Sequence, residues 1–260
     1  MLARAVMGLA LAGGIALAAR RMRSLSGSGA VGALAVGTIC IAADWSWGIL
    51  LIAFFASSSA LSRWRADAKA SRTEQVVAKG AERDVVQVLA NGGVFAACAA
   101  MSLLIPWEGW LVVGAGAIAA ATADTWSTEI GTLARSAPRS IVSGRSVPTG
   151  TSGGVTILGT MASVAGAGFI AILAWIVAWP AAAVPGAFVG GMAGSTADSL
   201  LGATLQSRRW CAACSAPTER DRHRCGAATR PAGGLPWLGN DGVNALASGV
   251  GALVAGMFAR

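Results

Sequence analysis

Eight apolar segments constrain the fold of this chain more than any other feature of its sequence. They lie at residues 2–19, 28–43, 46–61, 85–104, 110–131, 154–178, 186–206 and 240–258. Several approach the length of about 20 residues that a helix needs to cross a bilayer, where only helices or closed barrels satisfy the backbone. The pattern therefore predicts an all-α fold, a polytopic integral membrane bundle of about eight transmembrane helices.

Composition favours a membrane bundle over a soluble fold. Hydrophobic residues make up 55% of the chain and charged residues 12%, which is about half the charged fraction of soluble proteins. The chain also contains 35 glycines, and small residues let membrane helices approach one another closely.

The net charge of +8 is explained by topology. Of the 20 Lys and Arg residues, all except Arg4 and Arg260 lie in four connections or at the helix ends beside them. These basic connections are residues 20–27, 62–84, 132–153 and 207–239. Basic residues favour the cytoplasmic side, which predicts a bacterial-type inner (plasma) membrane protein with its N-terminus outside. Membrane lipids are expected partners and nucleic acid is not.

Carboxylates converge on the side of the basic connections. Asp124 and Glu129 end the fifth segment, Asp198 lies in the inner half of the seventh, and Asp241 opens the eighth. Acidic residues within membrane segments are costly, so they indicate function by default. Structural ion pairs with Lys79 or Arg83 remain the alternative. Asp124 and Glu129 are five residues apart, about 140° around a helix, so they share a pocket only if the site surrounds that helix or its end loosens.

Amides accompany these acids on neighbouring segments. Asn91 and Asn244 lie on polar stripes in which residues recur every four positions, Arg83-Gln87-Asn91 and Asn240-Asn244-Ser248. Such side chains either contact a ligand or hydrogen-bond one membrane helix to another.

The connection at 135–156 is rich in glycine and carries Arg139 and Arg145. Successive backbone N–H groups in a glycine-rich turn bind anions, and a helix N-terminus favours phosphate. The candidate phosphate-binding positions are Gly150, Thr151, Ser152, Gly153 and Gly154. Together with the acids they suggest Mg²⁺ bridging phosphate oxygens. The alternative is a flexible connector whose arginines only set the topology.

Four metal-ligating residues lie within 207–239: Cys211, Cys214, His223 and Cys225. Three thiolates and an imidazole suit tetrahedral Zn²⁺ and leave no open position for catalysis. We therefore predict a structural, zinc-knuckle-like loop here, with free or redox-active thiols as the alternative.

The motifs together resemble a membrane family that includes transmembrane protein 19 and the plant phytyl-phosphate kinase of the vitamin E pathway. They are "TADTWSTEIG", "SGRSVPTGTSGGVT", "GSTADSLLGATLQ", C-x2-C…H-x-C-G and "ND-x-VN", in this order between residues 79 and 250. The resemblance implies a CTP-dependent kinase that converts an isoprenyl monophosphate of the phytyl or geranylgeranyl type into its diphosphate, distantly similar to polyprenol kinases and lipid cytidylyltransferases. Residues 62–260 would then form the catalytic membrane domain, and 1–61 separate N-terminal helices.

We infer the following roles from this resemblance. Asp124, Glu129 and Asp198 are expected to hold Mg²⁺, while Lys79, Arg83 and Arg145 neutralise phosphates. The nucleotide is expected near the 150–154 loop and a further set of residues, Arg139, Ser195, Asn240, Asp241, Asn244 and Asn91. The prenyl tail is expected beside Gly190, Gly191 and Gly194, and a homodimer is compatible with this arrangement.

Two other functions fit the same residues. Attack at the α-phosphate of CTP would make the protein a cytidylyltransferase that forms a CDP-linked lipid. An ion-coupled transporter also uses acids within helices, but the acids here cluster at one face and leave no evident pathway across the membrane.

Overall fold

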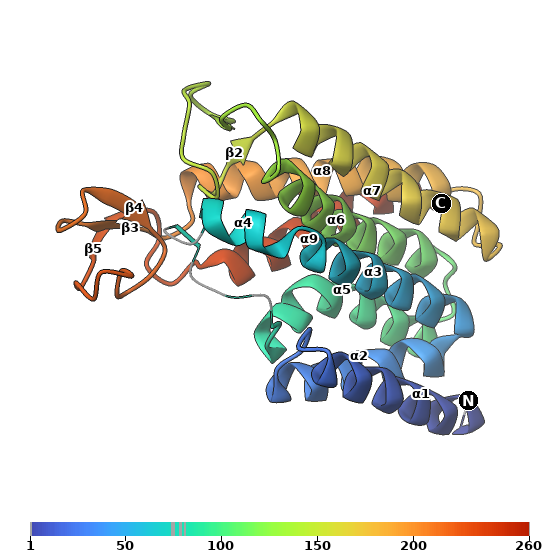
Figure 1. Cartoon of the computed structure of the whole chain (residues 1–260). Helices are drawn as coiled ribbons and strands as arrows, with labels where there is room; N and C mark the ends of the chain where they lie inside the picture. Colours follow the sequence, from blue (N-terminus) through green and yellow to red (C-terminus); the bar gives the residue numbers. More distant parts are fainter. Residues whose placement is uncertain (1, 74–75, 78–79, 81, 260) are drawn as a thin grey trace.

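The computed structural model describes residues 2–73, 76–77, 80 and 82–259. Within these residues each of the eight apolar segments forms a helix, in agreement with the sequence prediction (Figure 1). The helices are α1 (Leu2–Arg21), α2 (Gly27–Ala43), α3 (Trp45–Arg63), α5 (Val85–Leu104), α6 (Gly109–Gly131), α7 (Ile157–Ile176), α8 (Ala183–Thr204) and α9 (Asn240–Gly256). A short amphipathic helix, α4 (Ala66–Thr73), lies in the second basic connection.

Short strands add a small β component that the sequence did not predict. β1 (Arg139–Ser140) pairs antiparallel with β2 (Gly154–Val155), and β3 (Arg208–Cys211) pairs with β4 (Ala216–Thr218) and β5 (Arg230–Gly233). Both sheets lie in basic connections, so the bundle itself remains entirely helical.

Helix α6 forms the centre of the bundle. It packs against α3, α5, α7, α8 and α9, and its residues from Gly114 to Ala123 are all buried. This explains its composition: a helix that is surrounded on all sides needs small side chains, so that its neighbours can approach.

Glycines bring α6, α8 and α9 into backbone contact. A Cβ atom added at Gly116 would lie 2.3 Å from the carbonyl oxygen of Gly251, and one at Gly190 would lie 2.5 Å from the same oxygen. Eight residues beyond these glycines, α6 and α8 carry Asp124 and Asp198. The close packing therefore fixes the register that brings the two carboxyl groups together.

Gly194→Ala tests this packing. Its Cβ would lie 2.3 Å from the Cβ of Ala120 and 2.8 Å from the Ala247 carbonyl oxygen. We expect a loss of about 1–3 kcal/mol in the free energy of unfolding, measured as a lower melting temperature in detergent. Gly168→Ala is the control, because an added Cβ there meets no atom within 4 Å. Equal melting temperatures for the two variants would contradict the argument.

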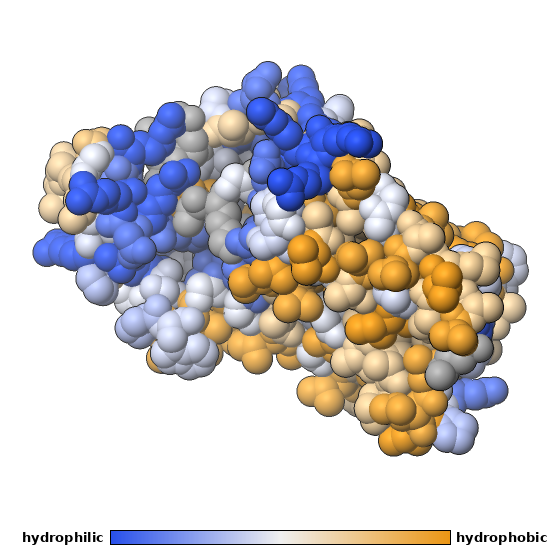
Figure 2. Space-filling model, turned by 90° about the horizontal axis from the view of Figure 1, so that it is seen from below, coloured by the Kyte–Doolittle hydropathy of each residue, from blue (hydrophilic) through white to orange (hydrophobic). Residues whose placement is uncertain are grey.

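The four basic connections meet at one end of the bundle. The backbone of Arg83 hydrogen-bonds that of Ser24, Arg72 donates to the Ala134 carbonyl oxygen, and the Glu219 N–H donates to Val76. Hydrophilic residues gather at the end of the molecule that carries β3–β5, and hydrophobic residues cover the helical part (Figure 2). This arrangement suits a bundle with one polar face at a membrane surface.

Within the described residues, four helices are long and apolar enough to cross a membrane: α1, α3, α5 and α7. Helix α2 is apolar but has only 17 residues. The helical, membrane-type architecture is thus confirmed, whereas the eight crossings and the external N-terminus stay predictions.

Candidate active site at the polar end of the bundle

An acidic pair lies where α6 and α8 approach the polar end. The carboxyl groups of Asp124 and Asp198 lie close enough to interact with each other. They line a small, closely packed polar pocket together with Asn91 of α5 and Asn244 and Ser248 of α9. The structure therefore brings together residues that the sequence placed on four different helices.

The acidic pair has the chemistry of a cation site. Two carboxylates in contact repel each other unless they share a proton or a cation. Asp198 Oδ2 is buried, and no described residue forms a hydrogen bond with it. The surrounding amide and hydroxyl oxygens are hard ligands of the kind that Mg²⁺ prefers. The donor set therefore fits Mg²⁺.

A third carboxylate, Glu219, approaches this pair and was missed by the sequence argument. It accepts hydrogen bonds from Ser152 Oγ at 2.6 Å and from Gln206 Nε2 at 2.8 Å. It is also close enough to Asp198 for the two charges to interact. Glu219 follows β4 in an irregular segment, where no periodic pattern indicates the direction of a side chain.

A larger, apolar pocket adjoins the acidic one. It has a cavity volume of about 80 Å³ and lies between α1, α2, α3 and α5. Polar groups occur in its lining at Arg83, Gln87, Asn91 and Thr125. Asn91 lines both pockets, and Thr125 directly follows Asp124. An apolar chain in the larger pocket would thus have its polar end near the acidic pair.

Arg83 brings a half-buried cation to this junction. Its guanidinium donates to Ser59 Oγ at 3.0 Å and to Ser62 Oγ at 3.3 Å, and lies over the ring of Phe55. Burial lowers the pKa of this guanidinium, while the charge of Glu129 opposes that shift. Arginine keeps its charge even when buried, so Arg83 can neutralise an anion here.

Glu129 faces a different neighbourhood from Asp124. It accepts a hydrogen bond from Ser62 Oγ and forms an ion pair with Lys69, a buried residue of α4. The structure thus does not bring Glu129 together with Asp124 and Asp198, because five residues of helix turn it away. The expected partner Lys79 lies outside the described residues.

We expect Glu129→Gln to destabilise the fold. The Lys69 ammonium would lose its counter-charge in a buried position, at a cost of about 3 kcal/mol in the free energy of unfolding. Chemical denaturation in detergent measures this, with the exposed Glu108→Gln as control. Unchanged stability would show that the pair does not anchor α4.

The glycine-rich loop packs tightly against its surroundings. The N–H groups of Thr151 and Gly154 donate to carbonyl oxygens of the loop itself, at 3.1 and 2.9 Å. Gly150 and Gly153 have φ angles of +89° and +76°, and a Cβ at Gly153 would lie 2.4 Å from that of Ala203 in α8. The loop is therefore less open to a phosphate than its sequence suggests, although Thr151 Oγ1 is buried without a partner among the described residues.

The remaining predicted nucleotide contacts are spread around the polar end. Arg139 donates to the Gly144 carbonyl oxygen and braces its own loop, whereas Arg145 is exposed. Ser195 is buried in α8, while Asn240 and Asp241 lie in the first turn of α9. Of this set, Asn91 and Asn244 line the acidic pocket.

The predicted position of the prenyl tail is wrong. Gly190, Gly191 and Gly194 are buried in helix contacts, where even one added Cβ would lie within 3.0 Å of another atom. These glycines are small because they permit close packing, so they leave no space for a chain. The apolar pocket lined by α1–α3 and α5 provides such space instead.

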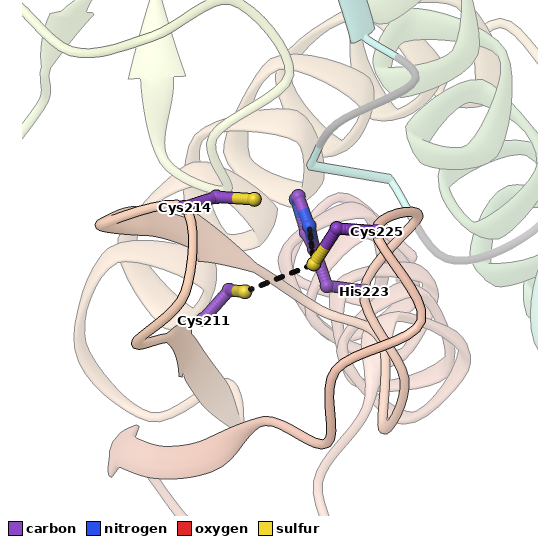
Figure 3. A group of neighbouring side chains, drawn as sticks. All are labelled: Cys211, Cys214, His223 and Cys225. Carbon is purple, nitrogen blue, oxygen red and sulfur yellow. Dashed lines mark hydrogen bonds between the residues drawn. The ribbon is translucent and has the colours of Figure 1, made fainter.

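The four metal-ligating side chains come together at the tip of the polar end, where they point toward one another (Figure 3). Their candidate ligand atoms all lie within 4.8 Å of one another. The Ala227 backbone, followed by the His223 and Cys214 side chains, lowers the pKa of the Cys225 thiol to about 6. A lowered pKa favours the thiolate, the form that binds metals.

Comparisons with known proteins agree with this architecture. Residues 10–252 match the family described as integral membrane protein DUF92. Protein PGR of Arabidopsis thaliana is 30% identical over 258 residues, covering 88% of this chain and 87% of its own length. An uncharacterized membrane protein of Methanocaldococcus jannaschii is 32% identical over 196 residues, covering 75% and 80%. No solved structure matches the chain.

The family match also includes the N-terminal helices, which the sequence resemblance had left out. It begins within α1 at residue 10 and not near residue 79. The family expected from the motifs is confirmed, and the chain belongs to the DUF92 family of integral membrane proteins.

Proposed function

We propose that this protein is a membrane-embedded, Mg²⁺- and CTP-dependent kinase that phosphorylates an isoprenyl monophosphate to its diphosphate. The polar end would face the cytoplasm, where nucleotides are available and where the basic connections are expected. CTP as the donor and a phytyl or geranylgeranyl chain as the acceptor follow from the family resemblance.

One observation carries this proposal: the apolar pocket and the acidic pocket share Asn91. A substrate with a single apolar chain and an anionic head matches both pockets at once. Its chain would lie between α1, α2, α3 and α5, and its phosphate would lie between Arg83 and the acidic pair.

The reaction needs little covalent chemistry from the protein. A phosphate oxygen of the prenyl monophosphate attacks the γ-phosphorus of CTP, the bond from that phosphorus to the bridging oxygen breaks, and CDP leaves. Such transfers depend on positioning and on neutralising charge. Arg83 would hold the acceptor phosphate, and Asn91 and Asn244 would orient it.

Asp124 and Asp198 would hold Mg²⁺, which neutralises phosphate oxygens when bound. Glu219 approaches the same pocket from the cytoplasmic segment and would complete the negative environment. Arg145 and Asn240 are exposed at this end and would meet the nucleotide phosphates. In this arrangement the donor enters from the polar end and the acceptor from the bilayer.

The test uses purified protein in nanodiscs with Mg²⁺, geranylgeranyl monophosphate and CTP labelled either in the γ-phosphate or in the base. We expect the γ-label in the lipid diphosphate and the base label in CDP. Base label on the lipid, with release of pyrophosphate, would establish cytidylyl transfer instead. Cation-driven uptake into liposomes without nucleotide turnover would replace both reactions with transport.

A further inference from the structure

The cysteine–histidine cluster has the dimensions of a tetrahedral zinc site. The Cys211 and Cys225 sulfur atoms are 3.7 Å apart, and His223 Nδ1 is 3.3 Å from Cys225 Sγ. Ligands about 2.3 Å (sulfur) and 2.0–2.1 Å (nitrogen) from a central ion would be separated by roughly 3.8 and 3.5 Å in a tetrahedron. The separation is also far longer than the about 2.05 Å of a disulfide bond.

The backbone supports the same geometry. Ser215, directly after Cys214, has a φ angle of 49°, and Gly226, directly after Cys225, has one of 84°. A non-glycine residue in this left-handed region costs about 1 kcal/mol, so the turn after Cys214 needs a compensating interaction. His223 Nε2 is buried without a partner among the described residues. The other ring nitrogen, Nδ1, faces Cys225 Sγ, so the ring is directed into the cluster.

The segment 207–239 has almost no hydrophobic core of its own. Its buried hydrophobic residues are Cys211 and Leu238, and one of these is a member of the cluster. A unit of about 40 residues or fewer usually needs a disulfide, a metal or a partner to fold. Since the cysteines are unpaired, a metal is the remaining means within the segment.

The segment 207–239 holds Glu219 in place near the candidate active site. Thr218 Oγ1 and the Glu219 N–H donate to the Val76 carbonyl oxygen, and Arg220 Nε donates to that of Val77. These contacts connect the segment to the second basic connection. Between them the Glu219 side chain reaches Ser152 and Gln206.

We propose that Cys211, Cys214, His223 and Cys225 bind one structural zinc ion, which folds the segment 207–239 and thereby positions the Glu219 charge near Asp198. The positioning of Glu219 has its catalytic meaning only if the proposed kinase function is correct. The zinc site and the fold of the segment do not depend on that function.

Elemental analysis of the full-length protein in detergent tests the site. We expect one zinc ion per wild-type chain, and less than about a tenth of that in Cys211→Ser and Cys225→Ser, because each removes a ligand. Cys98→Ser is the matched control and should keep its zinc, since Cys98 is buried in α5. The proposal would be overturned if wild-type protein contains no zinc and takes up no added Zn²⁺, or if it contains iron instead. Full zinc in both ligand variants would also overturn it.

Trypsin cleavage after Arg222 and Arg224 reports on the fold of the segment independently of activity. Removing zinc from wild-type protein with a chelator should raise the cleavage rate at least about tenfold, and adding Zn²⁺ back should restore protection. Cleavage that does not respond to zinc would overturn its structural role. Glu219→Gln should keep both zinc and protection while lowering kinase activity; full activity in this variant would refute the positioning role alone.

Discussion

Asp124→Asn and Asp198→Asn are each expected to lower kcat for diphosphate formation by about 100- to 1,000-fold. Each amide preserves the size of the side chain but removes a negative charge from the pair that would hold Mg²⁺. Electrostatic groups aimed at the reacting atoms have effects of this size. The measurement is product formation from CTP and geranylgeranyl monophosphate at saturating Mg²⁺.

The melting temperature separates this catalytic role from a structural one. Two carboxyl groups in contact are costly, so removing one charge should leave the melting temperature unchanged or raise it. An inactive variant with a much lower melting temperature would instead identify the pair as part of the scaffold.

Asp44→Asn is the matched control for both variants. Asp44 lies between α2 and α3, where its carboxylate accepts the Ser46 N–H as the N-cap of α3. Asn is an equally good N-cap, and the ion pair that Asp44 forms with Arg4 at 2.6 Å is half exposed. Such a pair contributes less than about 1 kcal/mol, so this variant should lose little stability and keep its activity. Loss of activity in Asp44→Asn would show that the assay responds to any charge removal.

The helices and the acidic pair were predictable because local patterns determine them. Apolar length gave the eight helices, and glycine-rich contacts between α6 and α8 place two similar "TAD" motifs at the same depth. Asp124 and Asp198 therefore meet as the sequence suggested. Glu129 was already the weaker candidate, since its position on the helix turned it away from Asp124.

The partners contributed by the connections could not be predicted. Lys69 belongs to a short helix whose position depends on contacts with α6, and Glu219 belongs to a segment without periodicity. Their side-chain directions follow from long-range packing, which a single sequence does not encode in a local pattern. Short motifs therefore indicated the acidic pair but not the partners that the connections contribute.

The contribution of the N-terminal helices to the apolar pocket could not be predicted either. The sequence separated residues 1–61 from the catalytic part, because they carry no recognisable motif. In the structure α1, α2 and α3 form most of the lining of the apolar pocket. A pocket for a hydrocarbon chain needs shape and apolar side chains, and neither produces a motif. The family match from residue 10 is in agreement with these helices belonging to the family's architecture.

Gly92→Phe should shorten the chain that the enzyme accepts. Gly92 lines the apolar pocket, where an added Cβ would make only ordinary contacts, 3.5 Å from Val36 and 3.9 Å from Leu51. A phenyl ring would occupy space that the prenyl tail would use under the proposed function. Displacing two CH₂ groups costs about 1.6 kcal/mol, a roughly 15-fold rise in KM for geranylgeranyl monophosphate. The KM for a five-carbon isopentenyl monophosphate should change less than about threefold, because a shorter chain buries less apolar surface in the pocket.

Two control variants separate the effect of the phenyl ring from the loss of the glycine and from the introduction of a ring elsewhere on α5. Gly92→Ala should keep chain-length selectivity, since its methyl group fits the contacts already present. Gly93→Phe places the same ring on the next position of α5, which does not line the pocket, and should leave both KM values unchanged. If Gly92→Phe raises the KM equally for the long and the short substrate, or for neither, the prenyl tail binds elsewhere. A selective loss for the long chain would establish that α1–α3 are part of the substrate site, because those helices enclose the space that the introduced phenyl ring removes.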